Sequence, residues 1–342
     1  MQDMITKEIK KNLEKQGYRT AGSHSAVKIC GWTKKTILGK GTCYKHKFYG
    51  INTHQCLQMT TSMSCANRCV FCWRDYKSPV SKDWIWNIDE PNKVLEEAKE
   101  AHHKLLIGFF GNDKTDKKAL KESKKIKHAA LSLTGEPINY PKVNELIQEM
   151  HKQRISTFLV TNGQNPESIK KLGRITQLYL SVDGADKETL RETGKPLFTD
   201  YWERLLKSLE ELKEKKYRTC IRITLIKGMN DKNPEKYAEL IKKAEPDFVE
   251  VKSYMFIGAS KERLKKENMP THTETMKFTE QIQKHLPNYE LMSDHKPSRV
   301  ALLTHIKHKI RGKWKTWIDF EAFFQEKQEY NTDTPKENII IK

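Results

Sequence analysis

The stretch SCANRCVFCWRD, residues 64–75, places three cysteines in the pattern C-x3-C-x2-C. These are Cys65, Cys69 and Cys72, and the aromatic residue Phe71 precedes the last of them. A loop this short can present three thiolates to one face of a cubic [4Fe-4S] cluster. Because no fourth cysteine follows closely, one iron would stay open for another ligand. The pattern therefore predicts a cluster that binds a small molecule.

The other four cysteines are spread more widely. Twelve residues separate Cys30 from Cys43, and twelve separate Cys43 from Cys56. This spacing leaves open whether the three hold a second cluster or are separate buried cysteines. Cys220 lies in the apolar run RTCIRITLI, where we expect it to act as a small hydrophobic residue. Zinc is the alternative metal at the short loop, but its nearest additional ligand, His54, precedes Cys65 by eleven residues.

Length and charge limit the classes of protein. The 342 residues fit one α/β barrel with extensions. The 63 Lys and Arg residues against 44 Asp and Glu give a formal charge of +19, which favours a polyanionic partner, while a well-solvated basic surface is an equally good explanation of the charge alone. No apolar run approaches the roughly 18 residues of a membrane span, and residues 1–19 have the pattern of a charged amphipathic helix. We expect a cytoplasmic monomer without a membrane segment.

After the cysteine loop, short apolar runs alternate with amphipathic helical patterns. Strands are expected at residues 56–63, 128–135, 156–162, 177–184, 220–228 and 247–255. Helices are expected at residues 92–106, 141–153, 201–215 and 234–244. Six units predict an α/β fold with a partial (β/α)6 TIM-like barrel, whose open side would admit a large substrate. The expected parts are an N-terminal extension at 1–55, a barrel core at 56–255, a C-terminal extension at 256–330 and a peripheral tail at 331–342.

Polar residues follow two neighbouring strands of this pattern. Asn162 stands in VTNG, and Ser181 and Asp183 stand in LSVDG. Taken singly, Asn-Gly and Asp-Gly are common turn pairs. Together at the carboxyl ends of parallel strands, where such barrels bind ligands, they are candidates to hold a ribose and a carboxylate.

The cysteine loop with its preceding aromatic residue resembles the motif of the radical S-adenosylmethionine superfamily. The resemblance implies that S-adenosylmethionine binds the open iron and is cleaved reductively to a 5′-deoxyadenosyl radical. It implies that Phe71 packs on the adenine, although Phe71 could equally face the core. The segment LSLTGEP resembles the superfamily's Gly-Gly-Glu segment, which binds the methionyl amino group. Thr134, Gly135 and Glu136 occupy these positions, with Thr134 in place of the first glycine.

A longer segment, GTCYKHKFYGINTHQCLQMTTSMSCANRCVFCWRD, closely resembles the archaeal tRNA 4-demethylwyosine synthases. The likeness continues through LSLTGEPINYP, EVKSYMFIG, NMPTHTE, HKPSRVALL and WIDF, and so covers nearly the whole chain. It implies that the adenosyl radical removes a hydrogen from the methyl group of N1-methylguanosine, just 3′ of the anticodon in tRNA(Phe). The carbon radical then adds to pyruvate, which contributes two carbons and loses its carboxyl carbon.

The same resemblance implies roles for the second cysteine set. Cys30, Cys43 and Cys56 match the ligands of a second [4Fe-4S] cluster with one open iron, which could present pyruvate. Lys45 matches the lysine proposed to bind pyruvate as a Schiff base, whereas by spacing alone it would be read as a surface charge. Since the sequence contains no recognisable flavin-binding domain, we expect a separate electron donor.

Basic segments are candidate tRNA contacts, because enzymes that modify a base expose it and hold the backbone with cations. They are residues 112–128, 259–267 and 305–317, the last including Trp314 and Trp317, and each could equally be a solvated face. Two other functions stay open. One is another radical enzyme with an auxiliary cluster, such as a tRNA methylthiotransferase, and the other is a non-catalytic RNA-binding protein with a structural metal.

Overall fold

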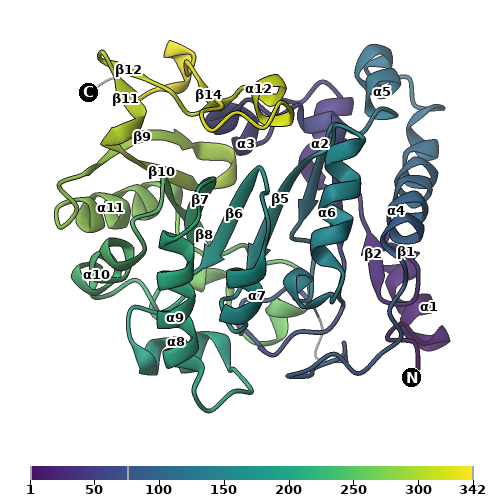
Figure 1. Cartoon of the computed structure of the whole chain (residues 1–342), viewed down its shortest axis with the longest axis horizontal. Helices are drawn as coiled ribbons and strands as arrows, with labels where there is room; N and C mark the ends of the chain where they lie inside the picture. Colours follow the sequence, from purple (N-terminus) through teal and green to yellow (C-terminus); the bar gives the residue numbers. More distant parts are fainter. Residues whose placement is uncertain (1, 75–76, 341–342) are drawn as a thin grey trace.

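The computed structural model describes residues 2–74 and 77–340. Its centre is a ten-stranded sheet in which six consecutive strands run parallel and lie in chain order (Figure 1). These strands are β3 (Cys56–Thr60), β4 (His128–Leu131), β5 (Ser156–Thr161), β6 (Gln177–Ser181), β7 (Arg218–Leu225) and β8 (Phe248–Ser253). All six coincide with the expected strands, and the predicted α/β fold with a partial barrel is confirmed.

Helices cover the outer face of the sheet between successive strands (Figure 1). The four expected helices are α4 (Pro91–Leu106), α6 (Val143–Lys152), α9 (Tyr201–Lys213) and α10 (Pro234–Ala244). The helical pattern of residues 1–19 is confirmed by α1 (Lys7–Lys15). The structure adds α5 (Lys117–Ser123), α7 (Pro166–Lys171), α8 (Lys187–Gly194), α11 (His272–Gln283) and α12 (Phe320–Phe324). Among the described residues, no helix is both long enough and apolar enough to cross a bilayer.

Side chains alternate between the two faces of the parallel strands. Leu159 and Val249 belong to the apolar core that packs beneath the outer helices. Their neighbours Phe158 and Phe248 belong to a second core, inside the barrel. Cys220 is fully buried in this inner core, as expected of a small hydrophobic residue.

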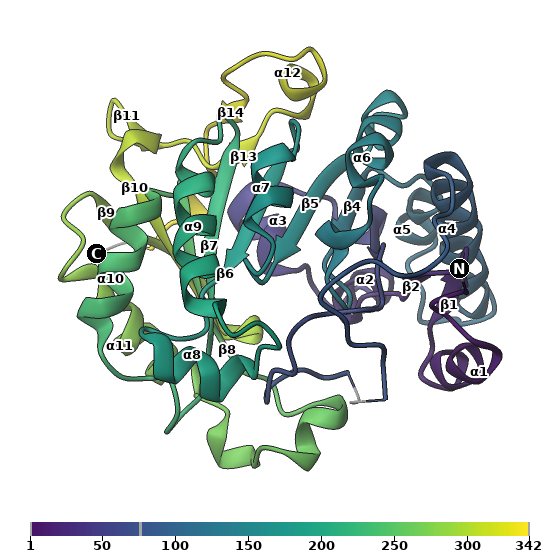
Figure 2. The same ribbon diagram turned by 60° about the horizontal axis from the view of Figure 1, so that its bottom comes forward.

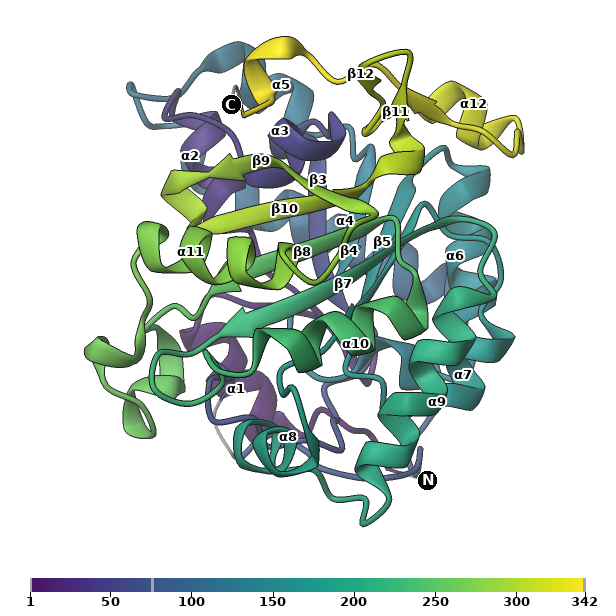
Figure 3. The same cartoon turned by 90° about the vertical axis from the view of Figure 1, so that its left-hand side faces the viewer.

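Antiparallel strands extend the sheet at both edges. The hairpin of β1 (Arg19–Ala21) and β2 (Ser25–Val27) pairs with β3, and the pair β9 (Tyr289–His295) and β10 (Val300–His305) joins through β8. Figure 3 shows β9 and β10 at the second edge. Residues 1–55 and 256–330 therefore each contribute strands to the same sheet as the barrel core.

Two short helices in the N-terminal region carry cysteines at their starts. Cys30 is the N-cap of α2 (Gly31–Ile37), and Cys43 is the N-cap of α3 (Tyr44–Tyr49). Helix α3 ends at Gly50, whose φ of 77° is left-handed. An added Cβ at Gly50 would lie 2.8 Å from the Trp317 ring, so only glycine allows this close approach. Through its aromatic side chains α3 joins the core inside the barrel.

The residues from 309 onward form two small antiparallel sheets at the edge of the molecule. Small strands pair there: β11 (Lys309–Ile310) with β12 (Lys313–Trp314), and β13 (Trp317–Ile318) with β14 (Asn331–Thr332). The backbone N–H of Ile340 donates to the carbonyl of Met292 at 2.8 Å. The tail at 331–342 was expected to be peripheral, and its last two residues lie outside the described part.

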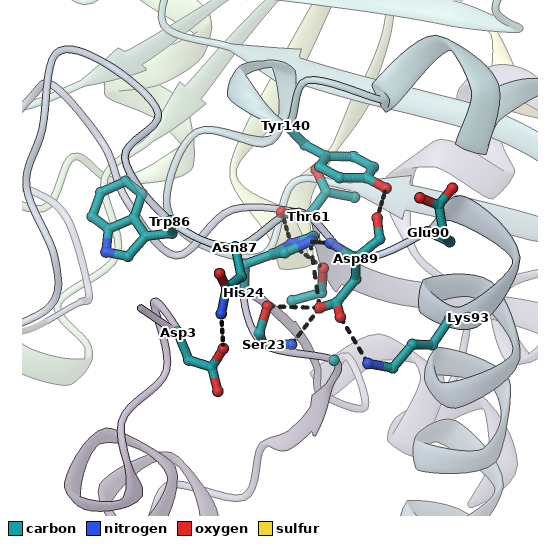
Figure 4. A network of polar contacts seen from close by, with 12 residues as sticks. Asp3, Ser23, His24, Thr61, Trp86, Asn87, Asp89, Glu90, Lys93 and Tyr140 are labelled. Atoms are coloured by element: carbon teal, nitrogen blue, oxygen red, sulfur yellow. Dashed lines mark hydrogen bonds and ion pairs between the residues drawn. The ribbon is translucent and has the colours of Figure 1, made fainter. Parts of the chain in front are cut away.

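A network of polar contacts fastens the β1–β2 turn to the segment before α4 (Figure 4). Asp89 Oδ2 accepts hydrogen bonds from the backbone N–H and the hydroxyl of Ser23, at 2.5 and 2.7 Å. Asp89 Oδ1 accepts from Lys93 at 2.7 Å. The backbone N–H of Asp89 donates to His24 Nε2 at 3.3 Å, so His24 carries its proton on Nδ1, 2.7 Å from the carbonyl of Thr61. This network positions β2 beside β3 and therefore the loop that follows β3.

We predict that Asp89→Asn destabilises the protein in a pH-dependent way. Burial opposes ionisation of Asp89, but the hydrogen bonds from Lys93 and Ser23 outweigh it and hold the pKa of the carboxyl below its ordinary value. The stabilisation that ionised Asp89 gives the folded protein is therefore complete above about pH 4, the ordinary pKa of the unfolded chain. It is lost as the pH falls through the lower pKa of Asp89 in the folded protein. Urea denaturation at pH 7 should show a loss of about 1.5–3 kcal/mol.

The exposed Asp113 is the control, and Asp113→Asn should cost little at any pH. An Asp89→Asn deficit that stays constant from pH 7 down to pH 3 would contradict the assigned network.

Candidate active site

One cavity of about 200 Å³ lies at the carboxyl ends of the parallel strands. Among its lining residues are all three cysteines of the short loop and every candidate cofactor contact: Cys65, Cys69, Cys72, Phe71, Thr134, Gly135, Glu136, Asn162, Ser181 and Asp183. Figure 2, in which the bottom of Figure 1 comes forward, shows the blue loop after β3 beside α8 at this end of the barrel. The structure thus brings together residues that are up to 118 positions apart in the sequence.

Backbone contacts fix the cysteine loop against α8. The N–H of Val70 donates to the carbonyl of Thr193 at 2.9 Å, and the N–H of Arg68 donates to the carbonyl of Gly194 at 3.0 Å. Arg263, from the C-terminal region, donates to the carbonyls of Val70 and Cys72. The loop is therefore held from two sides, which orders the three thiols before any metal binds.

The three thiols lie close together, with Cys65 buried and with Cys69 and Cys72 partly exposed. Burial raises the pKa of Cys65 to about 12 and that of Cys69 well above its ordinary value, and the neighbouring thiols act in the same direction. Cys65 Sγ accepts hydrogen bonds from the Asn67 N–H at 3.3 Å and from Asn162 Nδ2 at 3.4 Å. A metal centre would have to displace the thiol protons, and its positive charge would then stabilise the thiolates.

The described side chains form no site for a single metal ion. Within residues 2–74 and 77–340, no three His, Cys, Asp or Glu side chains surround one ion position. The tetrahedral zinc site considered from the sequence is therefore absent from this part of the chain. An iron–sulfur cluster is wider than one ion, so its thiolate ligands need not converge on a point.

Unpartnered polar atoms face this cavity. Glu136 Oε2 accepts the backbone N–H of Asn162 at 3.1 Å, whereas Glu136 Oε1 is buried without a partner. The hydroxyl oxygen of Thr134 is likewise buried and unpartnered. Burial raises the pKa of Glu136 to about 7. Since buried polar groups are normally hydrogen-bonded, these atoms fit a site completed by a polar ligand such as an ammonium group.

Gly135 permits two chain segments to cross beside the cysteine loop. Its φ is 66°, and an added Cβ would lie 1.8 Å from the carbonyl oxygen of Ser62. The next residue, Glu136, donates its backbone N–H to the carbonyl of Ser64 at 2.8 Å. The glycine therefore sets the distance between the β4 loop and the residues leading into Cys65.

The second cysteine set also comes together. Cys30 and Cys43 start two neighbouring helices, and Cys56 starts β3. Their charges act on one another, and burial raises the pKa of Cys56 to about 12. The even spacing in the sequence could not predict this, because the cysteines meet through tertiary packing, of α2 on α5 and on the short helix before β3, and of α3 inside the barrel.

Lys45 lies inside the barrel rather than at the surface. Its side chain is buried, with Nζ 4.9 Å from the centre of the Phe158 ring and 4.6 Å from that of Tyr179. Burial lowers the pKa of Lys45, and the charge of Arg222 acts in the same direction. The interpretation of Lys45 as a solvated surface charge is therefore wrong.

A buried ion pair that sequence analysis missed fixes α3. Arg222 donates to Glu250 Oε2 through Nε at 3.1 Å and through Nη2 at 2.8 Å. The hydroxyl of Tyr44 accepts from Arg222 at 2.7 Å, and the hydroxyl of Tyr49 donates to Glu250 Oε1 at 2.8 Å. Both tyrosines belong to α3, the helix of Lys45. The sequence does contain a signal for this ion pair, because Arg222 and Glu250 are charged residues within two otherwise apolar strands.

The basic segments differ in whether their lysines form ion pairs with acidic side chains. Trp314 is buried in the inner core, and Trp317 Nε1 donates to the carbonyl of Lys47 at 3.1 Å, so both indoles have structural contacts. Several lysines of 305–317 lie close to acidic groups, including Lys307 and Lys309. In the described chain, the following lysines of 112–128 form no ion pair: Lys114, Lys117, Lys118 and Lys121.

Comparison with known proteins gives two family matches. The Radical SAM superfamily model matches residues 59–241, and the model for Wyosine base formation matches residues 243–305. The chain is 46% identical over 322 residues to the S-adenosyl-L-methionine-dependent tRNA 4-demethylwyosine synthase TYW1 of Xenopus laevis, covering 94% of this chain and 44% of that protein. It is 47% identical over 328 residues to the rice (Oryza sativa subsp. japonica) synthase, covering 95% and 50%. The chain thus spans about half the length of these relatives.

Two solved structures align with this chain over nearly the whole of their own length. One, described as "Structure of TYW1 with a lysine-pyruvate adduct bound", is 42% identical with a TM-score of 0.80 and covers 90% of this chain and 99% of that one. The other, an archaeal TYW1 crystal structure, is 39% identical with a TM-score of 0.73 and the same coverage.

We predict that Gly135→Ala is far more damaging than Gly39→Ala. Both glycines have a left-handed φ, 66° and 67°, so both substitutions incur the conformational cost of about 1–2 kcal/mol. Nothing lies within 4 Å of an added Cβ at Gly39, whereas at Gly135 it overlaps the Ser62 carbonyl. Urea denaturation should therefore show an additional loss of about 1–3 kcal/mol for Gly135→Ala. Equal losses for the two variants would contradict the close crossing.

Proposed function

The chain belongs to the tRNA 4-demethylwyosine synthase family of the radical SAM superfamily, and we propose on that basis that it condenses N1-methylguanosine at position 37 of tRNA(Phe) with pyruvate. The product is 4-demethylwyosine, the tricyclic core of the wyosine bases. One observation supports this most strongly. A single barrel contains two separate groups of three cysteines, and a buried lysine lies beside the second group.

Membership of the superfamily implies S-adenosylmethionine and one [4Fe-4S] cluster, which together supply a 5′-deoxyadenosyl radical able to attack a methyl group. In this proposal Cys65, Cys69 and Cys72 hold that cluster. The residues proposed to bind S-adenosylmethionine are Phe71, Thr134, Gly135, Glu136, Asn162, Ser181 and Asp183. Their common cavity and the unpartnered Glu136 Oε1 support this assignment.

A second [4Fe-4S] cluster on Cys30, Cys43 and Cys56 is the next element of the proposal. Three ligands again leave one iron open, which could bind an oxygen-rich substrate such as pyruvate. The mutual proximity of the three thiols supports it, and so does the partial exposure of Cys30 and Cys56. The reductant would be a separate electron-donating protein.

Lys45 would hold pyruvate as a Schiff base. Its amine adds to the ketone carbon, water leaves, and an imine links the substrate to the chain. Burial favours this role, because it disfavours the charged ammonium form that cannot attack a carbonyl. A solved relative carries a lysine–pyruvate adduct, which adds independent support.

The RNA would approach the open side of the barrel. The target base must leave its stack to reach a buried radical, while cations hold the backbone. We propose contacts from residues 112–128 and from the C-terminal extension at 256–330. The N-terminal extension at 1–55 supplies second-cluster ligands to the core at 56–255. We further propose a cytoplasmic monomer.

The proposed reaction can be tested with anaerobically reconstituted protein, dithionite, S-adenosylmethionine and tRNA containing N1-methylguanosine. Mass spectrometry of digested nucleosides should show label from pyruvate in a tricyclic base. Cys65→Ala should abolish both 5′-deoxyadenosine and the base, while Cys220→Ala, which changes a buried cysteine outside both sets, should retain iron and produce both. If 5′-deoxyadenosine forms but no label enters the base, the substrate assignment fails, and a methylthiotransferase-like reaction becomes the next test. Absence of 5′-deoxyadenosine from the reconstituted protein would favour a non-catalytic RNA-binding protein.

We predict that Lys45→Met loses base formation without losing iron, because the substitution removes the amine and keeps an apolar chain of similar length inside the barrel. The control is Lys47→Met on the same helix, where the lysine instead pairs with Asp294 at 3.5 Å. Iron content and base yield are measured on both. Wild-type yield from Lys45→Met would remove the Schiff-base role.

A further inference from the structure

A second lysine, Lys252, belongs to the inner wall of the barrel. It lies on β8 two residues after Glu250, so the two side chains share a face, while Val249 and Val251 face the outer helices. In the sheet Lys252 is paired with Thr224 of β7 and with Val300 of β10. The position is therefore interior, near the carboxyl end of the strand.

Lys252 has no acceptor of its own. The side chain is partly exposed, and within the described chain no hydrogen bond or ion pair reaches its ammonium group. The nearby carboxylate, Glu250, is already bound by Arg222 and Tyr49. Burial lowers the pKa of Lys252 to about 8, and Arg222 acts in the same direction, yet the amine remains mostly protonated at neutral pH. Glu250 and Cys30 lie close enough to favour its charge, but neither is bonded to it, so the ammonium group is free to bind an anionic ligand.

The inner wall links this cation to Lys45. The Tyr179 ring on β6 contacts both the Lys45 ammonium, at 4.6 Å from its centre, and the Arg222 guanidinium, at 4.5 Å. Arg222 on β7 then reaches Glu250 on β8. Lys252 follows Glu250 on the same face of β8, so the inner-wall side chains form a continuous line from Lys45 to Lys252.

We propose that Lys252 binds the carboxylate of the α-keto acid whose ketone condenses with Lys45. The inference rests on the proposed function. When the Lys45 amine adds to the ketone carbon and water leaves, the substrate carboxylate stays ionised, and a cationic side chain beside it would add to the binding that the open iron of the proposed second cluster supplies. Arg222 is neutralised by Glu250. Arg218, the other arginine of the inner wall, donates instead to Gln177 and to the carbonyl of Thr316 at the opposite end of β7.

The proposal makes Lys252 a determinant of substrate specificity. A charge-assisted hydrogen bond to a carboxylate is stronger than one to a neutral group, particularly away from water. Lys252 should therefore favour a keto acid over its uncharged amide, although both present the same ketone to Lys45.

The test is reductive trapping on the reconstituted full-length protein. Cyanoborohydride fixes the imine formed with pyruvate or with pyruvamide, and peptide mass spectrometry measures the adduct at Lys45. For Lys252→Met, adduct yield from subsaturating pyruvate should fall about tenfold or more, while yield from pyruvamide stays at the wild-type level. Lys252→Arg should restore much of the pyruvate yield, since it restores the charge. The control Lys216→Met removes an exposed lysine and should change neither.

Iron content is measured on every variant. Equal loss of both adducts in Lys252→Met, or loss of iron from it, would overturn the proposal, because Lys252 would then support the pocket or a cluster rather than the carboxylate. Wild-type protein that traps neither ketone would instead refute the Schiff base at Lys45, and the carboxylate site with it. Unchanged selectivity between pyruvate and pyruvamide would overturn the carboxylate site alone.

Discussion

The buried ion pair between Arg222 and Glu250 is the interaction on which the interior of this barrel depends. It joins two neighbouring strands and holds α3 through Tyr44 and Tyr49, near the two ends of the helix. Breaking such a pair by removing one partner leaves an uncompensated charge and typically costs 3–5 kcal/mol. The tyrosine hydrogen bonds offset the cost of burying the pair. The ion pair in turn keeps α3 inside the barrel. Cys43 and Lys45 owe their positions to this helix.

The two cysteine sets are built in opposite ways. Cys65, Cys69 and Cys72 belong to one short loop, which α8 and Arg263 hold at the carboxyl ends of the strands. Cys30, Cys43 and Cys56 come from three elements that meet only through tertiary packing. The first set can form by local chain geometry, whereas the second requires that α2 and α3 are already in place. We therefore expect the second site to be the more sensitive to changes in the core.

Sequence analysis predicted the local features well, because strand periodicity and the C-x3-C-x2-C spacing are local. The six parallel strands, the four helices and the burial of Cys220 all follow from such patterns. It did not predict the antiparallel strands β1, β2, β9 and β10, whose edge pairing joins segments far apart in the chain. It gives Trp314 and Trp317 as candidates for RNA contact, and the structure shows that one is buried in the core and that the other donates to the backbone of α3. An aromatic residue among lysines has the same local pattern in either role.

The central claim is that one barrel holds two clusters with separate tasks. The most direct measurement is iron content with Mössbauer spectroscopy on three reconstituted proteins: wild type, the triple alanine variant of Cys65, Cys69 and Cys72, and the triple alanine variant of Cys30, Cys43 and Cys56. The account predicts about eight irons per chain in the wild type and about four in each variant. It also predicts reductive cleavage of S-adenosylmethionine only in the proteins that keep the short loop. A wild type with about four irons, unchanged by loss of Cys30, Cys43 and Cys56, would contradict the account.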